Sequence, residues 1–124
     1  MTSHKLTKSA GIKRNDKWLA KSYTIYNAHY HNNTLPDNIT VRFGKPLNGS
    51  DAHWDPAARE IVVDTTLNVH DALALICLHH EMAHVKMHMD GYIGGTTVED
   101  SHHGMRYQAE LNRLYQWGAY DGLL

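Results

Sequence analysis

Residues 71–91, DALALICLHHEMAHVKMHMDG, decide the fold of this 124-residue chain. Their apolar residues recur at spacings of three and four, which predicts a helix of about 20 residues. The expected core face of this helix consists of Leu75, Leu78, Met82, Val85 and Met89. Asn68 is the expected N-cap, and Gly91 can take the left-handed conformation that often ends a helix. The stretch therefore predicts one long helix with a buried face.

His80 and His84 lie on the face opposite this core, and they belong to His80-Glu81-Met82-Ala83-His84, an HExxH sequence. Histidines four residues apart project from one face of a helix about 6 Å apart, so both imidazoles can bind the same zinc ion. Glu81 lies about 100° around the helix, where its carboxylate can accept a proton from a metal-bound water. The motif therefore predicts a zinc-dependent hydrolytic site with Glu81 as the general base.

A catalytic zinc site of this kind needs a third protein ligand. The chain has one cysteine, Cys77, so the third ligand should be another histidine or a carboxylate. His88 is excluded because His80 and His88 lie about 12 Å apart along the helix axis. The spacing leaves four candidates open beyond the glycine-rich loop: His102, His103, Glu99 and Asp100.

Shorter patterns predict the other elements. Helical spacing of aromatic residues from Asp16 predicts a first helix that ends in the polar residues 31–33. Three short strands are expected at 39–43, 52–54 and 60–64, with the second returning from the first through a loop or hairpin. A C-terminal helix is expected from Met105 to Tyr120. The fold class is α+β: an N-terminal helix, a small three-stranded sheet, the HExxH helix and a C-terminal helix.

Composition limits the compartment and the partners. The single cysteine excludes an internal disulfide and favours a reducing compartment. No run of 18 apolar residues and no signal-type segment is present, so we expect no membrane contact and a cytoplasmic location. The net charge is −1, but residues 1–21 carry six basic residues and one acidic residue. Residues 1–15 are expected to form a flexible basic segment ahead of a domain at 16–124. The favoured interpretation of this segment is a solvated tail, and the alternative is a DNA contact.

Several motifs resemble those of the SprT-like zinc metallopeptidases, a family that includes the Spartan proteases. The family signature is HEMxH followed by a helix that opens with HGxxF, and this chain has HEMAH at 80–84 and HGMRY at 103–107. Similar features precede them, namely NNTLP at 32–36 and WDP at 54–56. The resemblance covers about residues 16–115. It implies a zincin-like minimal domain in which His80, His84 and His103 bind Zn²⁺ and Glu81 is the general base.

The resemblance also implies the activity, a zinc metalloendopeptidase that hydrolyses peptide bonds of protein substrates, DNA-associated proteins among them. The chain departs from the family pattern at Tyr107, where Phe is usual, and at Met105-Arg106, where Pro-Glu is common; it also has no cysteine pair for a zinc ribbon. The alternative hypothesis is a zinc-stabilised interaction or adaptor module without peptidase activity. Glu81 favours the enzyme, because a structural zinc site gains nothing from an adjacent base.

Overall fold

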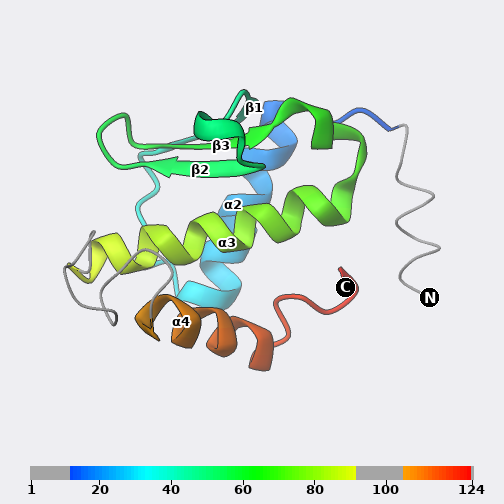
Figure 1. Cartoon of the computed structure of the whole chain (residues 1–124). Coiled ribbons are helices and arrows are strands. Elements are labelled where there is room, and N and C mark those ends of the chain that lie inside the picture. The colour runs from blue at the N-terminus through cyan, green and yellow to red at the C-terminus, as the bar shows by residue number, and fades with distance from the viewer. Residues whose placement is uncertain (1–11, 92–104, 124) are drawn as a thin grey trace.

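The computed structural model describes residues 12–91 and 105–123. Within these residues the fold is α+β, as the sequence predicts, with three α-helices and a three-stranded sheet. The helices are α2 (Asp16–His31), α3 (Asp71–Met89) and α4 (Met105–Gln116), and the strands are β1 (Thr40–Gly44), β2 (Ala52–Asp55) and β3 (Glu60–Asp64). Figure 1 shows α3 at the centre, between the sheet and α4, with α2 crossing behind it.

The sheet has the strand order β1-β3-β2, so of the two expected connections between the first two strands, a loop or a hairpin, the structure has the loop. β1 is parallel to β3, and β2 is antiparallel to β3. The short 3₁₀ helix η1 (Leu47–Gly49) lies in the connection from β1 to β2. The central strand β3 is the most apolar of the three, since Ile61, Val62 and Val63 are all fully buried. A central strand that is covered on both faces favours such a continuous apolar run.

Helix α3 begins later than the sequence suggests. Its N-cap is His70, and Asn68 instead lies buried in the 3₁₀ helix η2 (Thr65–Val69). Two hydrogen bonds, of 2.9 and 2.7 Å, join the guanidinium of Arg14 to the carboxylate of Asp71 in the first turn of α3. The Arg14 backbone N–H also donates to the Asn68 carbonyl at 2.8 Å. The other end agrees with the prediction, because Gly91 follows the helix with φ of +86°.

The core has two clusters because α3 is buried on two sides. Leu78, Met82 and Val85 face the sheet and α2, as expected. Met89 was expected in the same face, but it lies in the last turn and is 44% exposed. Met87 is buried instead, in a second cluster that includes residues of α4 and the C-terminal turns. The apolar face expected from the sequence is therefore only one of two buried faces of α3.

The C-terminal helix is shorter than predicted. It ends at Gln116 rather than Tyr120, and Gly118 takes a left-handed conformation with φ of +84°. The Ala119 N–H then donates to the Leu114 carbonyl at 3.0 Å, a bond that closes the end of the helix. The chain turns back, and Tyr120 becomes buried against α3. None of the helices in residues 12–91 and 105–123 is long and apolar enough to cross a membrane.

Candidate active site

The predicted zinc ligands that the structure describes, His80 and His84, lie one turn apart near the middle of α3. His80 is exposed and His84 is half-buried. The helix is regular through both residues, so their side chains project from one face. This is the arrangement that an HExxH zinc site requires, and imidazole nitrogens are preferred zinc ligands.

Glu81 lies between these histidines in the sequence and is half-buried. Burial raises the pKa of its carboxyl to about 7 in the metal-free protein, and a backbone hydrogen bond from Trp54 acts in the opposite direction. Trp54 belongs to β2, so this contact places the carboxyl beside an edge strand of the sheet. A carboxyl with a pKa near neutrality can both accept and return a proton at physiological pH. The sequence predicts a base at a position that is half-buried beside β2, where burial raises the pKa of the carboxyl.

The third predicted ligand, His103, lies outside the described residues, as do His102, Glu99 and Asp100. Within residues 12–91 and 105–123, no group of three or more His, Cys, Asp or Glu side chains is placed to hold a metal ion. The described part of the chain thus supplies a pair of histidines and the base. Their donor set fits zinc, and α4 begins two residues after His103.

Two neighbours of the motif have no place among the ligands. Cys77 is half-buried and packs against the core, and burial raises the pKa of its thiol to about 11. The thiol is therefore protonated near neutral pH in the metal-free protein, and it packs against the core as a small apolar group. His88 packs edge-on against Trp54 with 5.9 Å between ring centroids, one turn beyond the motif. This agrees with the exclusion of His88 on helix geometry.

The most unexpected residue of α3 is His79, which is fully buried. Its ring stacks on Tyr26 of α2 at 4.0 Å and packs edge-on against Tyr120 at 5.2 Å. Burial is the main reason that its pKa falls to about 3. Neither ring nitrogen has a hydrogen-bond partner of good geometry in the described structure. The nearby Ala119 backbone acts against burial and raises the His79 pKa. The aromatic seam of α2 was the sequence signal for this contact.

A partly buried group of polar residues around Arg113 holds α4 against α2. Arg113 of α4 binds Glu110 through two hydrogen bonds of 2.6 and 3.0 Å, and it donates to the Tyr30 carbonyl at 2.8 Å. It also lies 3.2 Å from Nδ1 of the buried His31. The last two contacts join residues more than 80 positions apart. They position α4 against α2.

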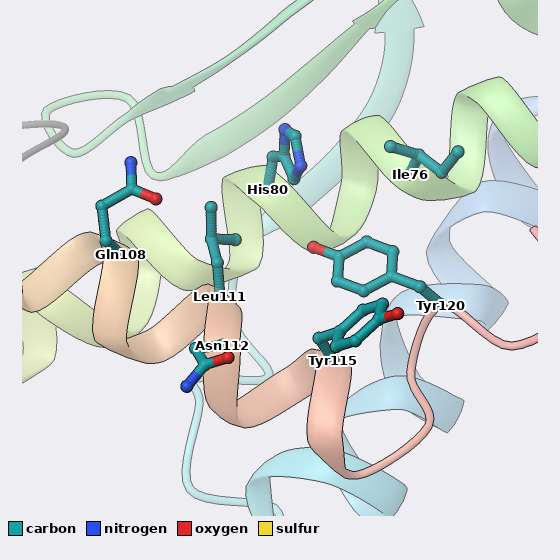
Figure 2. A pocket seen from close by; sticks show the side chains of 7 residues that line it. All are labelled: Ile76, His80, Gln108, Leu111, Asn112, Tyr115 and Tyr120. Atoms are coloured by element: carbon teal, nitrogen blue, oxygen red, sulfur yellow. The ribbon is translucent and has the colours of Figure 1, made fainter. Parts of the chain in front are cut away.

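A pocket of about 420 Å³ lies beside His80, between α3 and α4 (Figure 2). Besides His80, it is lined by Ile76, Gln108, Leu111, Asn112, Tyr115 and Tyr120. The rings of Tyr120 and His80 are 6.1 Å apart and nearly perpendicular. This pocket is not predictable from local sequence patterns, because its walls come from two helices and from the turns after α4.

Comparisons of the chain with protein-family models, curated proteins and solved structures give no match. The geometry of α3 and its surroundings is therefore the basis for inferring a function. Two histidines one turn apart, a carboxyl with a pKa near 7 and an adjacent pocket together suit metal-assisted hydrolysis.

Proposed function

We propose that this chain is a zinc-dependent metalloendopeptidase with a zincin-like fold. The observation that carries the proposal is the position of Glu81, on the HExxH turn of α3 and beside β2, with a pKa of about 7. A purely structural site would not require a carboxyl at this place. The resemblance to SprT-like peptidases supports the same reaction.

The residues of the proposed site have two tasks, metal binding and proton transfer. His80, His84 and His103 would hold the zinc ion, with His103 assigned from the resemblance. When bound, zinc polarises the scissile carbonyl and lowers the pKa of the attacking water. Glu81 accepts one proton from that water and passes it to the amine nitrogen as the C–N bond breaks. One peptide bond and one water thus yield a carboxyl and an amine.

The sheet offers a way to bind an extended substrate. β2 is at the edge of the sheet, and in the described residues its only partner strand is β3. A peptide that pairs with the outer edge of β2 would run beside Glu81, since the Trp54 backbone contacts that carboxyl. Backbone pairing of this kind reads little sequence, which suits a protein or peptide substrate in general.

The proposed DNA contact rests on the basic residues 1–15. Arg14 is not available for that contact in the folded domain, because its guanidinium is paired with Asp71. The contact would therefore depend on Lys5, Lys8 and Lys13, which would bring DNA-associated proteins to the site. A cytoplasmic location stays a prediction from the sequence.

The decisive experiment compares wild type with Glu81→Gln, both loaded with zinc, on a disordered protein with and without single-stranded DNA. We expect wild type to cleave and Glu81→Gln to be at least about 100-fold slower, the usual effect of losing a general base. Glu60→Gln is the matched control, because Glu60 lies on β3 and pairs with Arg42. Cleavage by zinc-bound Glu81→Gln at the wild-type rate would contradict the mechanism.

Removing the metal separates this proposal from the adaptor module. Two apolar clusters of described residues already form a packed core, so we expect chelation to abolish cleavage with only a modest loss of helicity. The measurement is far-UV circular dichroism before and after addition of chelator. Collapse of the helical signal on chelation would favour the zinc-stabilised module instead.

A further inference from the structure

The pocket beside His80 has mostly apolar walls. Ile76 comes from α3, Leu111 and Tyr115 from α4, and Tyr120 from the turns that follow α4 (Figure 2). The polar members of the lining set other than His80 are Gln108 and Asn112, which are both exposed residues of α4. Among the described residues, no Lys, Arg, Asp or Glu lines the pocket. A charged group placed inside it would lose its hydration without gaining an ion-pair partner.

Tyr120 adds a polar feature to this apolar pocket. The residue is only 7% exposed, and its hydroxyl has no hydrogen-bond partner in the described structure. Figure 2 shows the hydroxyl directed along α3, toward the side of His80 and away from Ile76. A buried hydroxyl without a partner is unfavourable, so a shift of the ring that brought it to a ligand would be compensated by the hydrogen bond gained. A backbone amide or carbonyl of a bound peptide is such a partner.

We propose that this pocket is a specificity subsite, which binds one large apolar or aromatic side chain of the substrate next to the scissile bond. This inference rests on the proposed peptidase function. The pocket volume of about 420 Å³ lies within the range for ligand sites, about 300–1,000 Å³, so the largest apolar side chains fit inside it. The position of His80 in its wall places the occupant beside the proposed metal site. Backbone pairing at β2 and side-chain selection here would then act on the same peptide.

The first test measures kcat/KM on peptides that differ only in having Phe, Leu, Ala or Asp on either side of the cleaved bond. We expect Phe and Leu to be preferred over Ala and Asp by about 100-fold at one position, because the pocket is mostly apolar and its described lining offers no charged partner. Asn112→Trp fills the pocket from its exposed rim, and we expect it to reduce the ratio of kcat/KM between Phe and Ala peptides at least about tenfold. Gln116→Trp is the control, on an exposed position of α4 outside the lining set.

The second test does not depend on cleavage. N-acetyl-phenylalanine amide is titrated into zinc-free Glu81→Gln, and the aromatic NMR signals of Tyr115 and Tyr120 are followed. We expect saturable shifts that disappear in Asn112→Trp and are absent with N-acetyl-aspartate amide. Binding without cleavage of any peptide would support the pocket and overturn the peptidase proposal. Cleavage with neither preference nor binding would overturn the pocket alone, and the absence of both binding and cleavage would overturn both.

Discussion

Acid should destabilise this protein through His31, a residue in the last turn of α2 whose side chain is buried. A guanidinium only donates, so the contact from Arg113 makes Nδ1 the acceptor and leaves the proton of the neutral ring on Nε2. Nε2 has no partner in the described structure. Burial is the largest cause that lowers the His31 pKa to about 4, and the charges of Arg113 and Lys86 act in the same direction. Glu110 is nearby, but its charge is balanced by Arg113.

The sign and the magnitude follow from these values. An unfolded histidine has a pKa near 6.5, so between pH 6.5 and 4 the folded state binds fewer protons than the unfolded state. Stability therefore falls as the pH is lowered through this window, and at about 1.4 kcal/mol per pKa unit the loss is about 3 kcal/mol. Glu81 acts in the opposite direction in metal-free protein, because its raised pKa contributes stability that is lost as the pH rises from about 4.5 to about 7. A comparison of variants is needed to isolate His31.

The assay is urea denaturation followed by circular dichroism between pH 4 and 7.5, with zinc removed by chelator. His31→Gln keeps an acceptor for Arg113 but does not titrate, so its free energy of unfolding should depend less on pH. We expect the difference between wild type and His31→Gln to change by about 3 kcal/mol across the range, mostly between pH 6.5 and 4. His29→Gln, on the exposed side of the same turn, controls for the exchange itself. Parallel pH profiles for wild type and His31→Gln would refute the reasoning.

Two further substitutions test the packing of α3. His79→Phe keeps the stack on Tyr26 and removes two buried ring nitrogens that have no hydrogen-bond partner. We therefore expect the free energy of unfolding at pH 7 to rise by about 1 to 3 kcal/mol. A decrease would mean that the imidazole has a stabilising partner. Leu78→Ala should lower that free energy by about 2 to 5 kcal/mol, because Leu78 is fully buried, and Leu73→Ala, at a half-exposed position of the same helix, should change it by less than about 1 kcal/mol. Equal effects of the two alanine substitutions, measured by urea denaturation, would contradict the assigned core.

Much of the secondary structure was predictable because its signals are local. The first helix was expected from Asp16 and ends at His31, close to the polar residues that were expected to stop it. The strands also lie close to their expected positions, since β-branched runs between turn residues are short-range patterns. The N-cap of α3 was not predictable in this way. Asn68 has the right chemistry, but it lies in η2, where its backbone carbonyl accepts a hydrogen bond from the Arg14 N–H.

The candidate site divides in the same manner. The sequence by itself determined the HExxH turn and the two histidines on one face, because spacing along a helix is a property of neighbouring residues. From the same motif it predicts Glu81 as the base. Only the tertiary structure decided that β3 is the central strand and that β2 lies beside Glu81. It also decided that burial raises the pKa of Glu81 and that His79 is buried. It also decided that a pocket opens beside His80. These features depend on burial between segments distant in the chain, and burial is a sum over contacts that no local pattern contains.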